Sequence, residues 1–577
     1  MNYELINYAL CIMNYELTEN GMQAGERYAI GIDYGSNSVR CLIVDCFDGR
    51  EAGVAVWNYR GGDAGVYSTP NNPHVARQCP GDFIDGLTET VPAALKVALE
   101  KTPGFAVDKI AGLGVDFTGS TPLPLDEKLQ PLAFQERFAE NLNAKAWMWK
   151  DHSAAAEADF ITKKAREMRP EYLKKCGGTY SSEWLFSKML HCLHVDSEVF
   201  NASYIWLEMA DYIPALLCGV TCVADLKVNI CAAGHKAMYN DDWGGYPDIE
   251  FMSALAPELG EMRKRMPQKA YTANNMAGRL CSEWAAKLGL PVGLPIAVGS
   301  LDAHLGAVGA GVGNGRMVKI IGTSVCDVLV SKPEVEVPDI PGVCGIVEGS
   351  LMPGVKGIEA GQTAVGDIFN WFVGKVCNGD SSLFGKLTEE ASALKPAQSG
   401  LLALDWENGN RCILTDARLT GLIMGLTLQT TQAEIYRCLL EATAFGARRI
   451  LDRLEEYGIE VGEVIACGGI ADKNPLFMQI YADVLGRPML ISASNQTCAL
   501  GAAMMGMLAA GVYPDVPSAQ AKICAFKDKV YRPVPSAKVI YDELYKLYCE
   551  LHDSFGVAGT SFDHAELMKR LLDLRCN

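Results

Sequence analysis

Two segments of the chain share one pattern of apolar and polar positions. Residues 28–44 read YAIGIDYGSNSVRCLIV, two apolar runs around a Gly-Ser-Asn-Ser turn, and residues 317–330 read MVKIIGTSVCDVLV, two apolar runs around Gly-Thr-Ser. Apolar runs of this length on either side of a glycine turn are typical of β-hairpins. Because the pattern recurs later in the chain, we predict two related halves that each begin with such a hairpin.

Further along, apolar strand patterns alternate with helical ones. Residues 111–126 predict a buried strand that ends in a Gly/Ser/Thr loop, and residues 294–311 a strand, an acidic turn and a helix of small residues. Residues 463–492 predict strand, glycine loop, helix and strand, and residues 497–511 a helix with small residues on one face. This alternation predicts an α/β protein with two lobes, each built on a sheet.

Two segments of the first half have helical character. Residues 138–172 include SAAAEADF, which is rich in helix formers. Residues 181–195 have helical apolar spacing, and a serine at 181 or 182 followed by Glu183 predicts a capping box at the start of the helix.

Glycine content and repeats suggest how the chain is divided. GAGVGNGR, at 309–316, marks the boundary between an N-terminal lobe at 27–310 and a C-terminal lobe at 311–550. MNYEL occurs at 1–5 and again at 13–17 without a basic start or a signal-cleavage site, so we expect 1–26 to be an extension outside the fold. Residues 551–577 form a tail with helical spacing, and its packing on the body or on a second subunit of a homodimer stays open.

Charge and cysteine usage exclude several classes of protein. The chain has 577 residues, 49% of them hydrophobic, and a formal net charge of −18. Such an acidic surface repels nucleic acid and anionic lipid, so we expect neither as a partner. The 20 cysteines include no C-x-x-C pair, and no stretch approaches a membrane span of about 20 apolar residues. We therefore expect a cytoplasmic protein with reduced thiols.

The turn of the first hairpin has the residues of a phosphate site. Backbone N–H groups at Gly35 and the hydroxyls of Ser36 and Ser38 are donors for phosphate oxygens. Asp33 suits a Mg²⁺-bound water and Arg40 a fixed cation beside the phosphates. The alternative is an ordinary hairpin whose aspartate caps the turn.

Two later turns offer similar donors. Gly322 and Thr323 occupy the turn of the second hairpin, and Gly468 and Gly469 precede a helix that begins near Asn474. A helix N-terminus favours anions, and a Gly-Gly surface lets a nucleotide ring lie close. The alternative for the last loop is a plain strand-to-helix turn.

An aspartate between a strand and a helix is the candidate proton acceptor. Asp302, in GSLDAHLG, either caps the helix or accepts the proton of an attacking hydroxyl. An aspartate in water has a pKa of about 3.9, so we expect Asp302 to be ionised at neutral pH. For His304 a packing role is favoured over catalysis.

These residues resemble those of the FGGY carbohydrate kinases. The Asp33 hairpin, SLDAH at 300–304, GTS at 322–324 and the stretch at 420–445 carry the resemblance, which extends from about 27 to 511. It implies a two-lobed, actin-like (ribonuclease-H-like) fold with the active site in the interlobe cleft, and ATP and Mg²⁺ as cofactors. It also implies catalysis by Asp302, a Mg²⁺-linked carboxylate at Asp33 and nucleotide contacts at the residues of the second and third turns.

Within this family the chain resembles the ribulokinases, through stretches at 114–126, 138–158, 231–240, 359–372 and 466–488. This implies ATP-dependent phosphorylation of L-ribulose, and of D-ribulose as a further option, at the 5-hydroxyl in arabinose breakdown. It implies sugar contacts by Gly119, Lys236 and Glu359, and less directly by Trp149 and Asp151. Two alternatives remain: a kinase for another pentulose or polyol, such as xylulose or ribitol, and a sensor that binds sugar or nucleotide without turnover.

Overall fold

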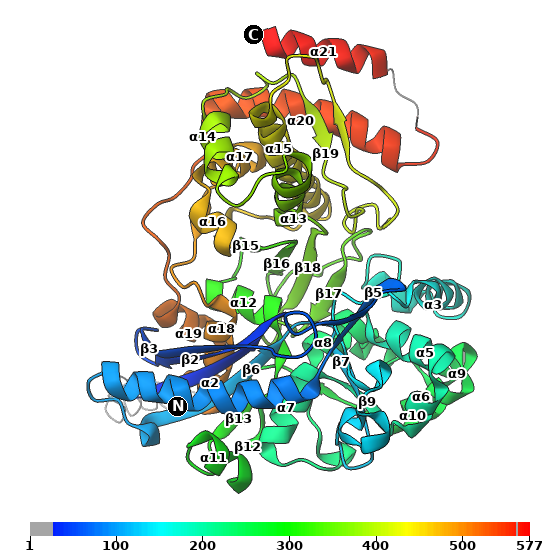
Figure 1. Cartoon of the computed structure of the whole chain (residues 1–577), viewed down its shortest axis with the longest axis vertical. Coiled ribbons are helices and arrows are strands. Elements are labelled where there is room, and N and C mark those ends of the chain that lie inside the picture. The colour runs from blue at the N-terminus through cyan, green and yellow to red at the C-terminus, as the bar shows by residue number, and fades with distance from the viewer. Residues whose placement is uncertain (1–26, 561–563, 577) are drawn as a thin grey trace, which may run out of the picture.

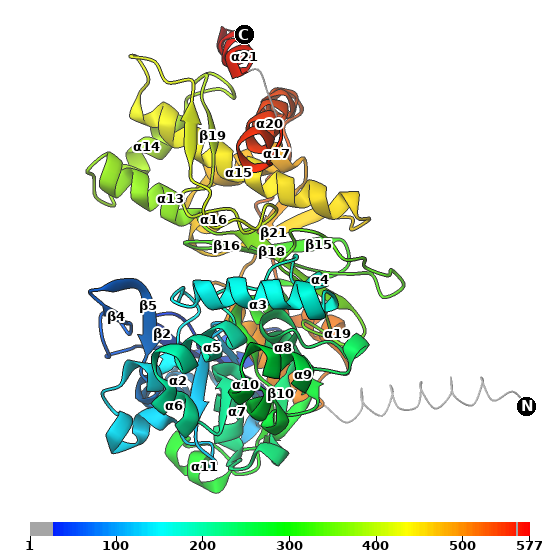
Figure 2. The same ribbon diagram turned by 90° about the vertical axis from the view of Figure 1, so that its right-hand side faces the viewer.

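The computed structural model describes residues 27–560 and 564–576, so the expected extension at 1–26 lies outside the described residues. Two lobes are stacked along the longest axis, each around its own sheet (Figures 1 and 2). Among the helices that the structure describes, none has both the length and the apolar character needed to cross a bilayer.

The first sheet is built on the hairpin that the sequence predicts. Its central strand pairs antiparallel with the second strand of the hairpin and parallel with a strand from residues 110–117. The strands in spatial order are β12 (Met276–Arg279), β13 (Pro295–Ala297), β6 (Ile110–Phe117), β1 (Tyr28–Tyr34), β2 (Ser38–Asp45) and β3 (Glu51–Asn58), with β14 (Ser300–Leu301) also paired to β6.

The second sheet repeats this topology. Again the first hairpin strand pairs antiparallel with its partner and parallel with a strand from much later in the chain, which confirms the prediction of two related halves. The strands in spatial order are β17 (Gly345–Glu348), β18 (Lys356–Gln362), β16 (Val325–Val330), β15 (Arg316–Ile321), β21 (Glu463–Cys467) and β22 (Met489–Ile491).

Helices cover both sheets, as buried parallel strands require. On the first sheet α2 (Pro80–Lys101) packs against β2 and β3, while α7 (Met209–Cys218) packs against β6 and β12. In the upper lobe α15 (Gln432–Glu456) and α17 (Pro475–Leu485) pack against each other and on the second sheet, and α20 (Pro535–Gly556) packs against α17 (Figure 1).

Two helices of small residues join the halves. The helix α12 (Asp302–Ala310) packs along α18 (Thr497–Ala509), and α18 also packs against β1 and β6 of the first sheet. Glycine permits this closeness, because a Cβ at Gly501 would overlap the backbone carbonyl oxygen of Leu305. A helix from the C-terminal half of the sequence thus packs on the sheet of the first lobe, so the lobes in space do not follow a single cut near residue 310.

Three local expectations differ from the structure. The predicted capping box is wrong: α5 (Leu185–Val195) begins after Trp184, which makes no side-chain cap, and the Ser181 hydroxyl accepts from the Glu183 N–H at 3.2 Å in the turn before the helix. In the segment 138–172, the main helix α3 (Ala155–Met168) begins only at Ala155.

The expected tail does not begin at residue 551, because α20 continues to Gly556. Beyond it, α21 (His564–Cys576) packs on the body of its own chain through the buried side chains of Leu567 and Leu571, and Arg570 pairs with Glu550 at 2.9 Å.

Candidate active site

Three aspartates meet where parallel strands of the first sheet end. Asp33 of β1 lies directly opposite Asp116 of β6, and Ser300 of β14 lies opposite Asp116 on its other side. The chain turns from β14 into α12 at Asp302. Ligands of open α/β sheets bind outside such carboxyl ends, so this edge is the candidate reaction centre.

The charges of these aspartates are coupled by burial. Asp116 is fully buried, and burial followed by the charges of Asp33 and Asp302 raises its pKa well above the ordinary value. Burial, and then the charge of Asp33, also raises the pKa of Asp302 to about 7. The expectation of an ionised Asp302 therefore holds only in part for the ligand-free protein at neutral pH, because the sequence does not show that its carboxyl is half-buried near Asp33.

Fewer groups in the turn of the first hairpin are available to a ligand than the sequence suggests. The Gly35 N–H donates to the Ser38 carbonyl oxygen at 2.9 Å, and the Ser36 hydroxyl accepts from the Trp149 indole N–H at 2.9 Å. The Ser36 hydroxyl donates to no group within residues 27–560 and 564–576, which leaves its proton for an acceptor such as phosphate. Arg40 donates to the Asp33 carboxylate at 2.8 Å across the hairpin, so it holds that carboxylate in place rather than standing free beside a ligand.

A second charged pair reaches across the lobes. Lys236, in α8 (Ile230–Ala237) of the first lobe, donates to both carboxylate oxygens of Glu359 in β18, at 3.0 and 3.1 Å. Burial opposes both charges, but each partner's charge overcomes it, so the pKa of Lys236 is raised and that of Glu359 is lowered. Both charges also act on Asp302, which brings the pair into the same centre.

Gly119 lies beside the same carboxyl. It is half-buried in the loop after β6, and a Cβ there would overlap the buried side chain of Leu301, the residue before Asp302. Any larger residue would therefore push against the segment that positions Asp302.

The turns of the second sheet form one exposed edge. The Gly322 N–H donates to the Ser324 carbonyl oxygen at 2.9 Å, which repeats the closure of the first hairpin. Gly468 lies against this turn, since a Cβ on it would overlap the Ile321 carbonyl oxygen. Open space faces Gly469, and the exposed residues of this edge are Gly322, Thr323, Gly468 and Gly469. Asn474 caps α17 by accepting from the Phe477 N–H at 3.0 Å.

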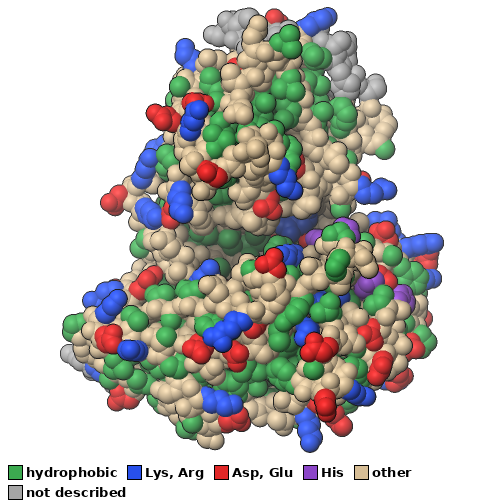
Figure 3. Space-filling model, viewed as in Figure 1, with side chains coloured by type: hydrophobic (Ala, Val, Ile, Leu, Met, Phe, Trp, Pro, Cys, Tyr) green, Lys and Arg blue, Asp and Glu red, His purple; other side chains and the backbone are tan. Residues whose placement is uncertain are grey.

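The N-terminus of α18 connects this edge to the aspartates. Burial, followed by the charges of Asp33, Asp116 and Asp302 and by Cys467, raises the pKa of the Cys498 thiol well above its ordinary value. Cys467 is the residue before Gly468, so both edges face one region. The space-filling view is hollowed between the lobes on the face shown in Figure 3.

Sequence reasoning missed one residue and placed another differently. Asp116 belongs to GVDF, and its position inside an apolar run indicates only that it is part of a strand. Asp151 is fully buried, pairs with Arg77 and accepts from the Ala76 N–H, so its carboxylate supports the fold instead of facing a sugar.

Comparison with known proteins identifies the family of the chain. Residues 28–309 match the N-terminal domain of the FGGY family of carbohydrate kinases, and residues 317–510 match its C-terminal domain. The chain is 40% identical over 548 residues to a ribulokinase of Vibrio parahaemolyticus, covering 91% of this chain and 95% of that protein. It is 40% identical over 568 residues to a ribulokinase of Halalkalibacterium halodurans, covering 95% and 98%.

Solved structures agree on the fold. A ligand-bound xylulose kinase from Lactobacillus acidophilus aligns with a TM-score of 0.76 at 19% identity, over 92% of this chain and 99% of its own. A glycerol kinase from Plasmodium falciparum with ADP aligns with a TM-score of 0.73 at 16% identity, over 91% and 98%. The two-lobed α/β fold expected from the sequence is thereby confirmed, and the chain belongs to the FGGY family of carbohydrate kinases.

Proposed function

We propose that this carbohydrate kinase transfers the γ-phosphoryl group of ATP to the 5-hydroxyl of ribulose, with L-ribulose as the preferred substrate. The observation that carries the proposal is the meeting of Asp302, with its raised pKa, and the cross-lobe pair of Lys236 and Glu359. The relatives that share about 40% identity over nearly their whole length are ribulokinases, which favours ribulose over xylulose or ribitol. A role in arabinose breakdown in the cytoplasm belongs to the same proposal.

The two halves divide the work in this proposal. The first lobe supplies Asp302, Gly119 and Lys236 to the sugar, and the second contributes Glu359 from its sheet. The nucleotide lies along the exposed edge of the second sheet, with its phosphates between the turns at Gly35 and Gly322. Nucleotide contacts are then made by Thr323, Gly468 and Gly469 and, from the first hairpin, by Ser36 and Ser38, while Asn474 orders the helix behind them.

The aspartate edge also fits the Mg²⁺ that the family implies. Apart from the neighbouring carboxyl of Asp33, neither carboxylate oxygen of Asp116 has a hydrogen-bond partner among the residues described. Carboxylates and waters are the ligands Mg²⁺ prefers, so Asp33 would hold the ion, through water, with Asp116 behind it. When bound, the ion supplies positive charge that offsets the charge on the phosphate oxygens.

The chain's own residues then account for the transfer. The 5-hydroxyl oxygen forms a bond to the γ-phosphorus as the bond from that phosphorus to the bridging oxygen breaks, and ADP leaves. Asp302 orients the hydroxyl and takes its proton, for which a pKa near 7 is better suited than one near 4. Such a transfer depends mainly on positioning and charge, and closure of the lobes around the sugar would exclude water.

A substrate panel tests the proposal. ADP release is measured with L-ribulose, D-ribulose, xylulose and ribitol side by side at equal concentrations and saturating ATP. We expect the highest kcat/KM with L-ribulose. A higher kcat/KM with xylulose or ribitol would make that compound the preferred substrate. Sugar binding in calorimetry, with no ADP formed in the presence of any of the four sugars, would point to a sensor.

A further inference from the structure

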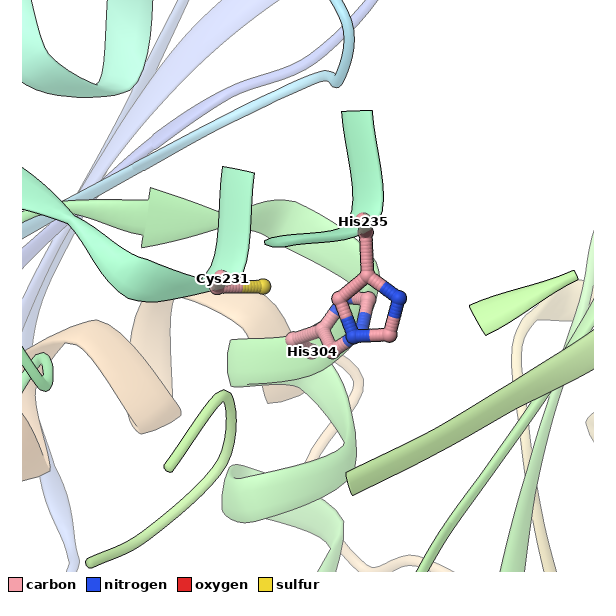
Figure 4. A group of neighbouring side chains, drawn as sticks. All are labelled: Cys231, His235 and His304. Atoms are coloured by element: carbon pink, nitrogen blue, oxygen red, sulfur yellow. The ribbon is translucent and has the colours of Figure 1, made fainter. Parts of the chain in front are cut away.

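Behind the charged pair lies a cluster of metal-ligating side chains that the phosphoryl transfer does not use. Cys231 and His235 are one turn apart on α8, and His304 is in the first turn of α12. All three are buried, and a ligand atom of each lies within 4.8 Å of those of the other two. Figure 4 shows the imidazole rings of His235 and His304 against each other, with the Cys231 sulfur pointing toward them.

Hydrogen bonds do not explain why the two imidazoles are buried. Neither ring nitrogen of His235 or of His304 makes a hydrogen bond within the described part of the chain. A buried polar group left unpaired destabilises the fold, and four such atoms on two neighbouring rings call for an explanation. A neutral imidazole keeps a lone pair on one ring nitrogen, and that lone pair can bind a metal.

A fourth ligand stands at the correct spacing. The Oε2 atom of Glu359 lies 3.5 Å from Nδ1 of His235 and 3.8 Å from Nε2 of His304. In a tetrahedral zinc site with bonds of about 2.0–2.3 Å, neighbouring ligand atoms are about 3.3–3.6 Å apart. The distance from Glu359 to His235 already fits this range. The distance of 3.8 Å from Glu359 to His304 and those among the other ligand atoms, up to 4.8 Å, have to shorten by up to about 1.5 Å, which side-chain rotation can supply.

We propose that Cys231, His235, His304 and Glu359 form a binding site for a borderline-soft divalent cation of the zinc class, and that the bound ion draws Glu359 away from Lys236. One sulfur and two imidazole nitrogens select such an ion over Mg²⁺, which prefers oxygen. The Cys231 thiol releases its proton on binding, so a thiolate and a carboxylate neutralise the two charges of the ion. Metal binding thereby weakens sugar binding, a consequence that rests on the proposed function.

Metal stoichiometry and the Co²⁺ spectrum test the site without reference to activity. The full chain is stripped with a chelator and dialysed against Zn²⁺ or Co²⁺ in excess Mg²⁺, and bound metal is measured by mass spectrometry. We expect one ion per chain and, with Co²⁺, a thiolate-to-metal charge-transfer band. Cys231→Ser should lose the band and at least tenfold in affinity, whereas Cys222→Ser, at an exposed cysteine, should keep both.

Other results would overturn the site. Binding below one ion per chain, or an unchanged band and affinity in Cys231→Ser, removes the assignment. His304→Gln tests the imidazole ligand and should also lower the affinity for the metal. If that variant does not fold, the comparison of Cys231→Ser with Cys222→Ser still tests the site.

Sugar kinetics test the consequence for Glu359. Enzyme loaded with one Zn²⁺ and freed of excess metal should show a KM for ribulose raised at least fivefold, with an unchanged KM for ATP. An unchanged KM for ribulose in loaded enzyme would overturn the inhibitory role. If the chain does not phosphorylate ribulose at all, the metal stoichiometry and the Co²⁺ band remain valid, so the failure of one proposal is not mistaken for failure of the other.

Discussion

Lys236 and Glu359 come from opposite lobes, 123 positions apart in sequence, and meet in a two-pronged ion pair at 3.0 and 3.1 Å. Both side chains are buried, so water and salt ions screen the attraction between the two charges only weakly. This ion pair thus connects helix α8 to the sheet of the other lobe. It also places two hydrogen-bonding groups near Asp302.

Removing one partner of this pair should harm both stability and sugar binding. Glu359→Gln leaves Lys236 buried with a lone charge, and we expect a loss of about 3–5 kcal/mol of unfolding free energy. Among molecules that still fold, the KM for ribulose should rise more than the KM for ATP. The measurements are urea unfolding and steady-state kinetics.

A surface pair provides the matched control. Lys332 and Glu460 are also 3.0 Å apart, but Glu460 is exposed and Lys332 only half-buried, so Glu460→Gln should change stability by less than about 1 kcal/mol. An equal loss of stability in the two variants would mean that burial of the pair has no energetic role.

The pKa of Asp302 predicts how activity depends on pH. If its carboxylate takes the hydroxyl proton, kcat/KM for ribulose should fall as pH drops through about 7, because the carboxyl becomes protonated. Asp302→Asn should lower kcat by about 10²–10⁴-fold and abolish this limb of the profile. A profile that stays flat from pH 8 to pH 5.5 in the wild-type enzyme would remove Asp302 from the role of base.

The same carboxyl should reduce the stability of the ligand-free protein above neutral pH. Its folded-state pKa of about 7 exceeds the ordinary value of 3.8, so the folded state binds the proton more tightly than the unfolded state. Stability therefore falls as pH rises from about 4 to 7, and the loss persists above 7. Asp302→Asn should raise the melting temperature at pH 8, on the order of a few kcal/mol in stability, and leave it nearly unchanged at pH 4. Thermal melts at both pH values check the sign.

Local features of this fold could be predicted from the sequence because they are encoded locally. The hairpins around Gly35 and Gly322 carry strand residues and turn residues within a few positions of each other, and both form with the same Gly N–H to Ser carbonyl bond. The strand-to-helix turn at Asp302 was equally visible. Turn chemistry and apolar runs suffice for such elements.

What depends on packing between distant segments could not be predicted. The capping pattern at 181–183 is not used, since the helix begins at Leu185. The pairing of Asp33 with Arg40 and the burial of Asp116 follow from strand register, which a pattern of apolar residues does not specify. Likewise, the approach of His304 to His235 exists only after α8 and α12 pack together.

Asp116 should influence the metal that accompanies the nucleotide. Its carboxyl is fully buried and faces Asp33, and its raised pKa favours the protonated form in the ligand-free protein. Asp116→Asn therefore removes a carboxyl that could ionise when Mg²⁺ binds at this edge. We expect the Mg²⁺ concentration for half-maximal activity to rise about tenfold, and the melting temperature of the ligand-free protein to rise as well, since a buried carboxyl is lost. Asp108→Asn, at an exposed position, should change neither. If both variants show wild-type Mg²⁺ dependence, Asp116 serves the fold alone.

Gly469 allows the nucleotide edge to be tested without disturbing the fold. A methyl group on it meets no atom within 4 Å, so Gly469→Ala should leave the melting temperature within about 2 °C of wild type, and it should raise the KM for ATP about tenfold if the nucleotide lies against this surface. Gly313, before the start of β15 and so at the far end from Gly322, has equally open space and is the control: Gly313→Ala should change neither quantity. An ATP KM unchanged in both variants would place the nucleotide elsewhere, whereas an equal rise in both would mean that the methyl group acts through the backbone and not by meeting the ligand.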